Sequence, residues 1–268
     1  MPVSKINDLN IYYEVHGQGE PLLLIAGLGN DCQAWQFAIN TLSNHFKTII
    51  FDSRGVGRSD TPSAPYSVKE MAADTIALLD HLKIENAHII GHCLGGFIAQ
   101  EIAINNSHRV RKLILEATSP FTTRRNADLF MNFYDAWKSG MDMELWMKQL
   151  LYWLLSQKSV EDEKFFNSML RYNLDYPYPQ PIEGFLGHVQ AFSNFNSSKE
   201  LYRISSETLM LIGSDDILTL PGETELLYQG ITRASYPIYI ENAAHSIHLE
   251  QPKAFCNAVL GFLYKYVR

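Results

Sequence analysis

The first half of the chain alternates short runs of consecutive apolar residues with stretches in which apolar residues recur every three or four positions. A continuous apolar run is typical of a strand buried on both faces of a sheet, and the longer period is typical of an amphipathic helix. The apolar runs predict a hairpin of two short strands and then four further strands, over 5–17, 21–27, 47–52, 87–91 and 110–118. The periodic stretches predict helices over about 32–44, over 67–82 and from about 94. Ser67 and Glu70 match a capping box at the start of the second helix.

This alternation stops between about 120 and 204, where no run typical of a buried strand occurs. The segment instead has helical stretches rich in aromatic residues, such as "LFMNFYDAW" and "MELWMKQLLYWLL". Two strand-like runs and a final helix then follow, at 208–213, at 235–241 and from about 252. Strands that alternate with helices form a mostly parallel sheet covered on both faces. The pattern therefore predicts an α/β core built from 1–119 and 205–268, interrupted by a helical insertion over 120–204.

Composition narrows the class of protein. Hydrophobic residues make up 46% of the 268 residues and charged residues 19%, which supports a large core. The net charge of −7 argues against nucleic acid or an anionic membrane as a partner. Because there is no apolar run of 18 residues and no secretory signal, we expect no membrane span. The three cysteines form no CxxC pair, so we expect no disulfide framework or zinc site and a cytoplasmic location. The sequence leaves open whether the chain forms a homo-oligomer.

The segment "GHCLGG" (91–96) joins a predicted strand to a predicted helix. Gly-x-Cys-x-Gly fits the nucleophile-elbow pattern with cysteine in the place of serine. The glycines have a physical reason, because the tight turn leaves no room for neighbouring side chains. The free N–H groups at the start of the helix would stabilise a thiolate at Cys93. The alternative interpretation is a buried structural cysteine at a glycine-rich turn.

A nucleophile of this kind needs a base, and the base needs an acid that orients it. The segment "AAHSIH" offers His245, on a loop after a predicted strand, and His248 three residues later. The segment "GSDD" places two aspartates just after another strand. The order Cys93, Asp216, His245 matches the order of nucleophile, acid and base in one hydrolase fold. Glu116, which ends the strand before the insertion, is the rival candidate for the acid.

An oxyanion that forms during acyl transfer needs hydrogen-bond donors. The backbone N–H of Leu94, directly after Cys93, is one candidate, and that of Leu28 in the loop "AGLGN" is the other. Neighbouring glycines let this loop approach a substrate closely. Neither "GLGNDC" nor "GVGRSD" has the third glycine of a dinucleotide-binding turn, so we expect no such cofactor, and no metal either.

With these motifs the chain resembles the α/β-hydrolases of the small esterase and lactonase group, which includes 3-oxoadipate enol-lactonases. Five segments carry the resemblance. The oxyanion segment is "LLLIAGLGNDCQAW", the loop after the next strand is "FDSRGVGRSD", and the elbow is "GHCLGG". The acid turn is "GSDD", and the histidine loop is "AAHSIHLEQP". The resemblance implies an α/β-hydrolase fold with a mostly parallel eight-stranded sheet, and it implies that the insertion is a helical cap. In the family's acid turn the third residue after the glycine is the acid, which implies Asp216 rather than Asp215.

The chain departs from the family's pattern at two places. The oxyanion segment usually reads His-Gly, and here it reads Ala26-Gly27. Most relatives carry serine at the position of Cys93, although a minority that includes the dienelactone hydrolases uses cysteine.

The predicted substrate-binding residues are three tryptophans, one after the oxyanion segment and two in the insertion: Trp35, Trp137 and Trp153.

The resemblance and the residues together predict a hydrolase that acts on a small-molecule acyl substrate. Cys93, His245 and Asp216 would cleave a carboxylic ester, a lactone or a thioester through a covalent acyl-enzyme. Two alternatives remain open: an acyltransferase on the same scaffold, and a non-hydrolytic protein that binds a small molecule. Arg124 and Arg125, at the start of the insertion, would either bind a substrate carboxylate or carry solvated surface charge.

Overall fold

Eight strands form one sheet in the computed structural model, which describes residues 2–264. In chain order they are β1 (Val3–Ile6), β2 (Leu9–His16), β3 (Pro21–Ile25), β4 (Lys47–Phe51), β5 (Ala87–His92), β6 (Val110–Glu116), β7 (Glu207–Gly213) and β8 (Ile238–Ile240). The order across the sheet is β1-β2-β4-β3-β5-β6-β7-β8. Strands β1 and β2 pair antiparallel at one edge, and every pairing from β4 to β8 is parallel. The prediction of a mostly parallel sheet is confirmed.

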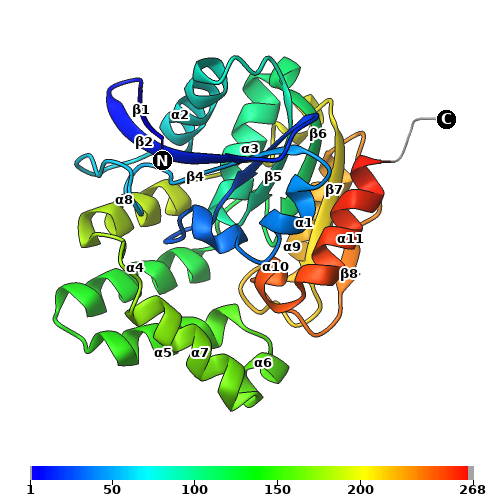
Figure 1. Cartoon of the computed structure of the whole chain (residues 1–268). Helices are drawn as coiled ribbons and strands as arrows, with labels where there is room; N and C mark the ends of the chain where they lie inside the picture. The colour runs from blue at the N-terminus through cyan, green and yellow to red at the C-terminus, as the bar shows by residue number, and fades with distance from the viewer. Residues whose placement is uncertain (1, 265–268) are drawn as a thin grey trace.

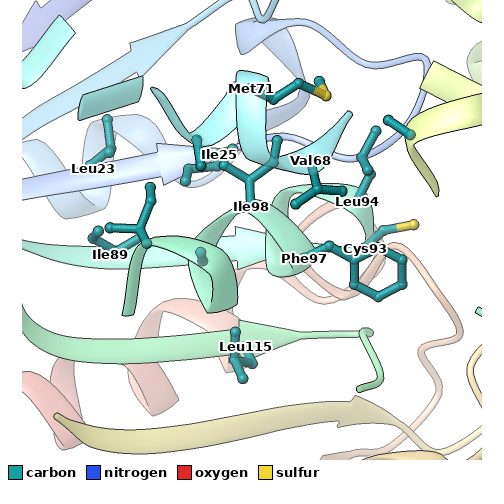
Figure 2. Packing of buried hydrophobic residues seen from close by; sticks show 14 of the residues in the cluster. Leu23, Ile25, Val68, Met71, Ile89, Cys93, Leu94, Phe97, Ile98 and Leu115 are labelled. Atoms are coloured by element: carbon teal, nitrogen blue, oxygen red, sulfur yellow. The ribbon is translucent and has the colours of Figure 1, made fainter. Parts of the chain in front are cut away.

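Helices cover both faces of this sheet (Figure 1). Those outside the insertion are α1 (Ile39–Ser43), α2 (Val68–His81), α3 (Leu94–Asn105), α9 (Pro221–Gly230), α10 (Ile247–Glu250) and α11 (Pro252–Leu263), with 3₁₀ turns at Cys32–Trp35 and Ser107–Arg109; a third 3₁₀ turn, Leu201–Arg203, ends the insertion. Helices α2 and α3 bury apolar side chains such as Met71 and Ile98 against one face (Figure 2). Helices α1 and α11 bury others, such as Leu42 and Phe255, against the opposite face. Each face therefore carries its own apolar core.

Three elements differ from the predicted ones. The helix predicted over 32–44 is a 3₁₀ turn followed by the short α1, and the Asp31 carboxylate caps the 3₁₀ turn by accepting from Gln33 N. The strand predicted over 235–241 pairs only over Ile238–Ile240, at the edge of the sheet. Helix α9 was not predicted, and its Pro221 stands at the first helical position, where proline is tolerated.

The insertion (residues 120–204) lies between β6 and β7 and forms five helices. They are α4 (Arg124–Lys138), α5 (Met143–Leu154), α6 (Gln157–Glu161), α7 (Glu163–Leu174) and α8 (Ile182–Ser193). Helices α5 and α7 share a small apolar core that includes Leu151 and Leu170. In Figure 1, helices α4 to α7 lie together at one end of the sheet.

Candidate active site

Cys93 stands at the sharp turn between β5 and α3. Its backbone has φ 52° and ψ −115°, which a non-glycine residue adopts only at a cost of about 1–3 kcal/mol. The neighbouring glycines permit the turn, because a Cβ at Gly91 would overlap the carbonyl oxygen of Gly95, and one at Gly95 would overlap that of Ile25. Cys93 is buried, with 6% of its surface exposed. The sequence therefore produces the strained geometry that the elbow pattern predicts.

The loops after β7 and β8 bring His245 and Asp216 together. The Nδ1 atom of His245 lies 3.0 Å from Oδ2 of Asp216, and both side chains are buried. The other carboxylate oxygen, Oδ1, accepts hydrogen bonds from the backbone N–H groups of Leu218 at 2.8 Å and Thr219 at 2.9 Å. Because the carboxylate only accepts, Nδ1 of His245 carries a proton, and in the neutral imidazole Nε2 presents a lone pair.

The electrostatics of His245 favour a strong base. Burial alone would lower the pKa of His245, but the Asp216 carboxylate and the nearby Cys93 side chain raise it well above its usual value. Its Nε2 atom is buried and has no hydrogen-bond partner among the residues that the structure describes. Cys93 and His245 line the same cavity. An imidazole in this setting can take the proton of the thiol.

Two backbone N–H groups next to Cys93 are unpaired in the described part of the chain. These are the groups of Leu28 and Leu94, the predicted oxyanion donors. The carbonyl of Gly27 accepts a hydrogen bond from Asn30 N at 3.2 Å. The N–H of Leu28 belongs to the same peptide group, so it points away from Asn30, in the direction opposite to that carbonyl. The next N–H, that of Gly29, is already used, because it donates to Nδ1 of His188 at 3.3 Å.

A second histidine–carboxylate pair lies close to the first, and it involves Glu116, the other candidate for the acid that orients His245. Glu116 is completely buried, and its Oε1 accepts from both Nδ1 and the backbone N–H of His248, at 2.8 and 3.0 Å. The ring of His92 lies between the two histidines, with centroid distances of 5.0 Å to His245 and 4.8 Å to His248. Glu116 therefore pairs with His248, and Asp216 is the carboxylate that pairs with His245.

A cavity of about 450 Å³ opens on Cys93 and His245. Its walls combine the carboxyl ends of the strands with apolar side chains of α4, α5 and α7, such as Trp137, Met147 and Leu150. No lysine or arginine of residues 2–264 lines it. The insertion thus covers the predicted nucleophile with a largely apolar wall.

A family model described as alpha/beta hydrolase fold matches residues 20–252. The chain belongs to the α/β hydrolase fold family. A curated relative from Azorhizobium caulinodans, named "Putative carbamate hydrolase RutD", is 29% identical to this α/β hydrolase over 98% of both chains. The enzyme "3-oxoadipate enol-lactonase 2" of Acinetobacter baylyi is 26% identical over 97% of this chain and 95% of its own. A solved hydrolase structure from Pseudomonas aeruginosa PA01 is 26% identical, with a TM-score of 0.89 and 98% of each chain covered.

The three tryptophans predicted to bind substrate occupy different places in this α/β hydrolase. Trp137 lines the cavity. Trp35 does not, because it is completely buried on the other side of His248, with its ring 4.5 Å from that of the histidine. Trp153 packs at the edge of the core and is not a lining residue either. Trp35 is thus buried in the core and Trp153 is half-buried at its edge, so neither lines the cavity that opens on Cys93.

The two arginines at the start of the insertion are also away from the cavity. Arg124 is exposed and pairs with Asp128 at 3.3 Å within its own helix. Arg125 donates to the backbone carbonyls of Ile217 and Leu218 at 2.9 and 3.0 Å. Neither arginine lines the cavity. Arg124 therefore carries surface charge, as one of the two interpretations expected. Arg125 joins the insertion by hydrogen bonds to the loop that carries Asp216.

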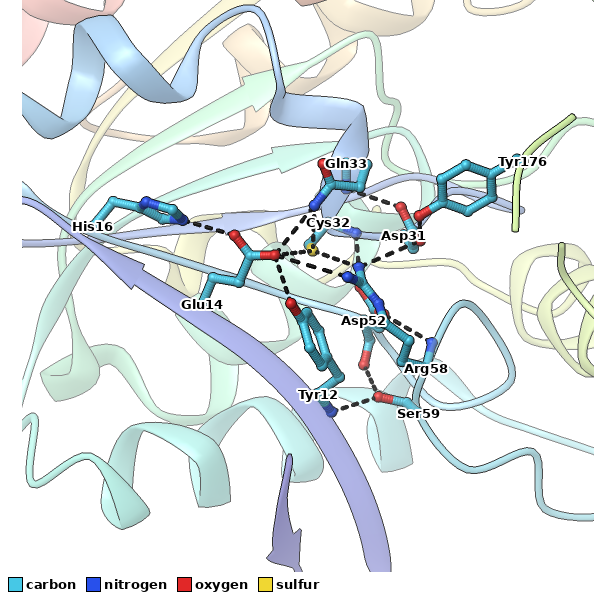
Figure 3. A network of polar contacts seen from close by, with 10 residues as sticks. All are labelled: Tyr12, Glu14, His16, Asp31, Cys32, Gln33, Asp52, Arg58, Ser59 and Tyr176. Atoms are coloured by element: carbon cyan, nitrogen blue, oxygen red, sulfur yellow. Dashed lines mark hydrogen bonds and ion pairs between the residues drawn. The ribbon is translucent and has the colours of Figure 1, made fainter. Parts of the chain in front are cut away.

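In the wall of the cavity, a polar contact that the sequence analysis did not predict joins the core to the insertion. The hydroxyl of Tyr176 donates to the carboxylate of Asp31, and both residues line the cavity (Figure 3). Burial and the nearby Asp52 carboxylate raise the pKa of Asp31. Arg58 bonds Asp52 at 3.0 Å and lies 3.6 Å from Asp31, so it balances both acids.

Residues 2–264 contain neither a metal-ligand cluster nor a helix that could span a membrane. No group of three or more His, Cys, Asp or Glu side chains there has an arrangement that would hold a metal ion. None of the helices in this part of the chain is long and apolar enough to cross a bilayer. Cys32, Cys93 and Cys256 are all free and buried.

Proposed function

We propose that this α/β hydrolase cleaves esters, thioesters or lactones of neutral, largely apolar acyl groups, with Cys93 as the nucleophile. The single observation that carries the proposal is the buried His245–Asp216 pair, whose unpaired Nε2 opens on the same cavity as the strained Cys93. We further propose that residues 120–204 act as a helical cap on a core of 1–119 and 205–268, because their apolar side chains close that cavity.

In the first step, His245 Nε2 takes the proton of the Cys93 thiol, and the sulfur attacks the carbonyl carbon of the substrate. The N–H groups of Leu28 and Leu94 stabilise the oxyanion, and one such donor is worth about 3 kcal/mol in a comparable enzyme. The intermediate then collapses, the bond to the leaving group breaks, and His245 returns its proton to the leaving alcohol or thiol. Asp216 keeps the imidazole in the tautomer that this transfer requires.

The thiol nucleophile restricts the leaving group. A thiolate is itself a good leaving group from the tetrahedral intermediate, so a poor leaving group such as an amine is expelled less readily than the sulfur. Esters, thioesters and lactones release better leaving groups. These substrates therefore fit Cys93 better than amides do.

The charge of the cavity restricts the acyl group. Asp31 is the only carboxylate that lines it among the described residues, and no cationic lysine or arginine does so. A substrate carboxylate would leave water without gaining a charged partner, which is unfavourable. Methionine, leucine and tryptophan side chains instead offer contact to an uncharged chain. We therefore assign neutral acyl groups to the cavity.

The test of the function compares hydrolysis of p-nitrophenyl butyrate by the wild-type protein, Cys93→Ala and Cys256→Ala. Cys256 is also a free, buried cysteine, but it lies in α11 on the opposite face of the sheet, so it is the matched control. We expect the Cys93→Ala variant to lose turnover and Cys256→Ala to keep it. Equal hydrolysis by Cys93→Ala and the wild-type protein would overturn the proposal.

A matched pair of substrates tests the charge preference. The p-nitrophenyl ester of hexanoic acid and the mono-p-nitrophenyl ester of adipic acid have acyl chains of equal length, and only the second ends in a carboxylate. Because a buried charge without a partner costs several kcal/mol, we expect kcat/KM for the adipate ester to be about 100-fold lower. Equal values for the two esters would contradict the assignment.

A further inference from the structure

A small niche also opens on Cys93 and His245, and within residues 2–264 these are the only two that it shares with the large cavity. Its volume is about 10 Å³, close to the smallest space that holds one water molecule. The remaining wall combines four polar residues with four apolar ones: Thr118, Ser119, Asn126 and Thr219, and Phe97, Ala117, Phe192 and Leu218. The niche therefore has polar groups in its wall, is of the size of one water, and lies next to the two groups that carry the proposed chemistry.

The hydroxyl groups of three residues that line this niche have no proton left to donate into it. Those of Thr118, Ser119 and Thr219 all donate to backbone carbonyls, at 2.9, 2.7 and 3.2 Å. A hydroxyl that donates its only proton elsewhere can only accept further hydrogen bonds. The Nε2 atom of His245 also presents a lone pair, because Nδ1 carries the proton. The niche thus offers acceptors for both protons of a water molecule.

We propose that this niche binds the water molecule that hydrolyses the acyl group on Cys93; this inference rests on the proposed function. The water donates one proton to the Thr219 hydroxyl and the other to His245 Nε2, so that its lone pair faces the acyl carbon. As the bond from oxygen to carbon forms, His245 takes the second proton. The bond from carbon to sulfur then breaks, and the Cys93 thiolate takes the proton from His245. The products are a carboxylic acid and the free thiol.

The same arrangement selects water over larger acceptors. An alcohol has a carbon atom where water has its second proton, so it cannot donate to both acceptors at once. The niche also has no room for that carbon. The enzyme therefore hydrolyses the acyl-enzyme in preference to passing the acyl group to an alcohol, which distinguishes a hydrolase from an acyltransferase on this scaffold.

Two substitutions of Thr219 separate the chemistry of the niche from its size. Thr219→Val keeps the shape and removes the acceptor oxygen, and Thr219→Ser keeps the oxygen and removes a methyl group. Thr224→Val is the matched control, because Thr224 is equally buried but lies in α9, outside the niche. Each protein is mixed with p-nitrophenyl butyrate in stopped flow. The burst of p-nitrophenol reports acylation, the steady rate reports deacylation, and intact mass reports the acyl-enzyme.

We expect Thr219→Val to slow deacylation about fivefold relative to acylation, since the loss of one hydrogen bond costs of the order of 1 kcal/mol. The acyl-enzyme should then accumulate, whereas Thr224→Val should behave like the wild-type protein. In the presence of methanol, Thr219→Ser should raise the ratio of methyl ester to acid. Deacylation in Thr219→Val as fast as in Thr224→Val, or an unchanged product ratio in Thr219→Ser, would overturn the niche proposal. Absence of any acyl-enzyme in the wild-type protein would instead overturn the proposed function.

Discussion

Replacement of Asp216 by asparagine should disable the base without removing any atom from the site. Oδ1 of Asp216 accepts from two backbone N–H groups, so the amide oxygen of the asparagine must occupy that position. The amide NH₂ group then takes the place of Oδ2 and faces Nδ1 of His245. Because NH₂ only donates, Nδ1 must become the acceptor, and the ring proton moves to Nε2. His245 then has no lone pair with which to take the Cys93 proton.

The size of the effect follows from this change of tautomer. The same replacement in a serine enzyme with this arrangement lowers kcat by about 10⁴-fold, or about 5 kcal/mol. A cysteine thiol ionises slightly on its own, so acylation by Cys93 should suffer less than this. Deacylation still needs a base to activate water, and it should show the full loss. We therefore expect Asp216→Asn to accumulate acyl-enzyme.

The assay is stopped-flow hydrolysis of p-nitrophenyl butyrate at pH 7, with intact mass measured at each time point. Asp215→Asn is the matched control, because the Asp215 side chain is exposed and, among the described residues, accepts only from its neighbour Ser214. This variant should stay within about twofold of the wild-type rate, as surface substitutions usually do. Asp216→Asn turnover within tenfold of the wild-type rate, or an equal loss in Asp215→Asn, would refute the reasoning.

Two further predictions concern folding. Gly91→Ala should lower the free energy of unfolding by about 1–3 kcal/mol, because its Cβ would overlap the carbonyl of Gly95. Gly222→Ala is the control and should not lower it, because its added Cβ meets no atom of residues 2–264 within 4 Å, apart from its chain neighbours and the backbone of its own helix. Thermal melts measure both variants, and an unchanged Gly91→Ala melt contradicts the packing argument. Burial lowers the pKa of His188 from 6.5 to about 4. Between these two pH values the unfolded chain therefore binds a proton at His188 and the folded chain does not. Stability should therefore fall by about 3 kcal/mol as pH drops from 6.5 to 4, and urea titrations should show a smaller fall in His188→Asn.

Much of the fold and the grouping of the site residues could be predicted because both depend on local signals. Continuous apolar runs marked the parallel strands, and residues at their carboxyl ends meet at one edge of the sheet. That rule alone brings the loops of Cys93, Asp216 and His245 together, as the structure does. The glycines around Cys93 added a steric requirement that can be read from sequence.

The contacts between the insertion and the core could not be predicted, because they join residues far apart in the chain. His188 bridges Gly29 of the oxyanion loop and the carbonyl of Arg54, and Tyr176 bonds Asp31. No periodic pattern marks such partners. The tryptophans show the same limit, since an aromatic residue in a core and one in a cavity wall have the same pattern of neighbours in sequence.

The pairing of Glu116 with His248 also could not be predicted from the sequence. A glutamate at the end of β6 and an aspartate after β7 are equally close to the expected position of a base, and two histidines three residues apart are available to them. Only the short α10 decides the matter, because it turns His248 toward Glu116 and leaves His245 to Asp216.

The central claim is that Cys93 forms a covalent bond with the acyl group. The most direct test is to mix the protein with p-nitrophenyl butyrate, quench it with acid within the burst, digest it and locate the added mass by tandem mass spectrometry. Our account predicts a butyryl group on the peptide that contains Cys93, and none on those that contain Cys32 or Cys256. Hydrolysis without an adduct at Cys93, or an adduct at another residue, would contradict it.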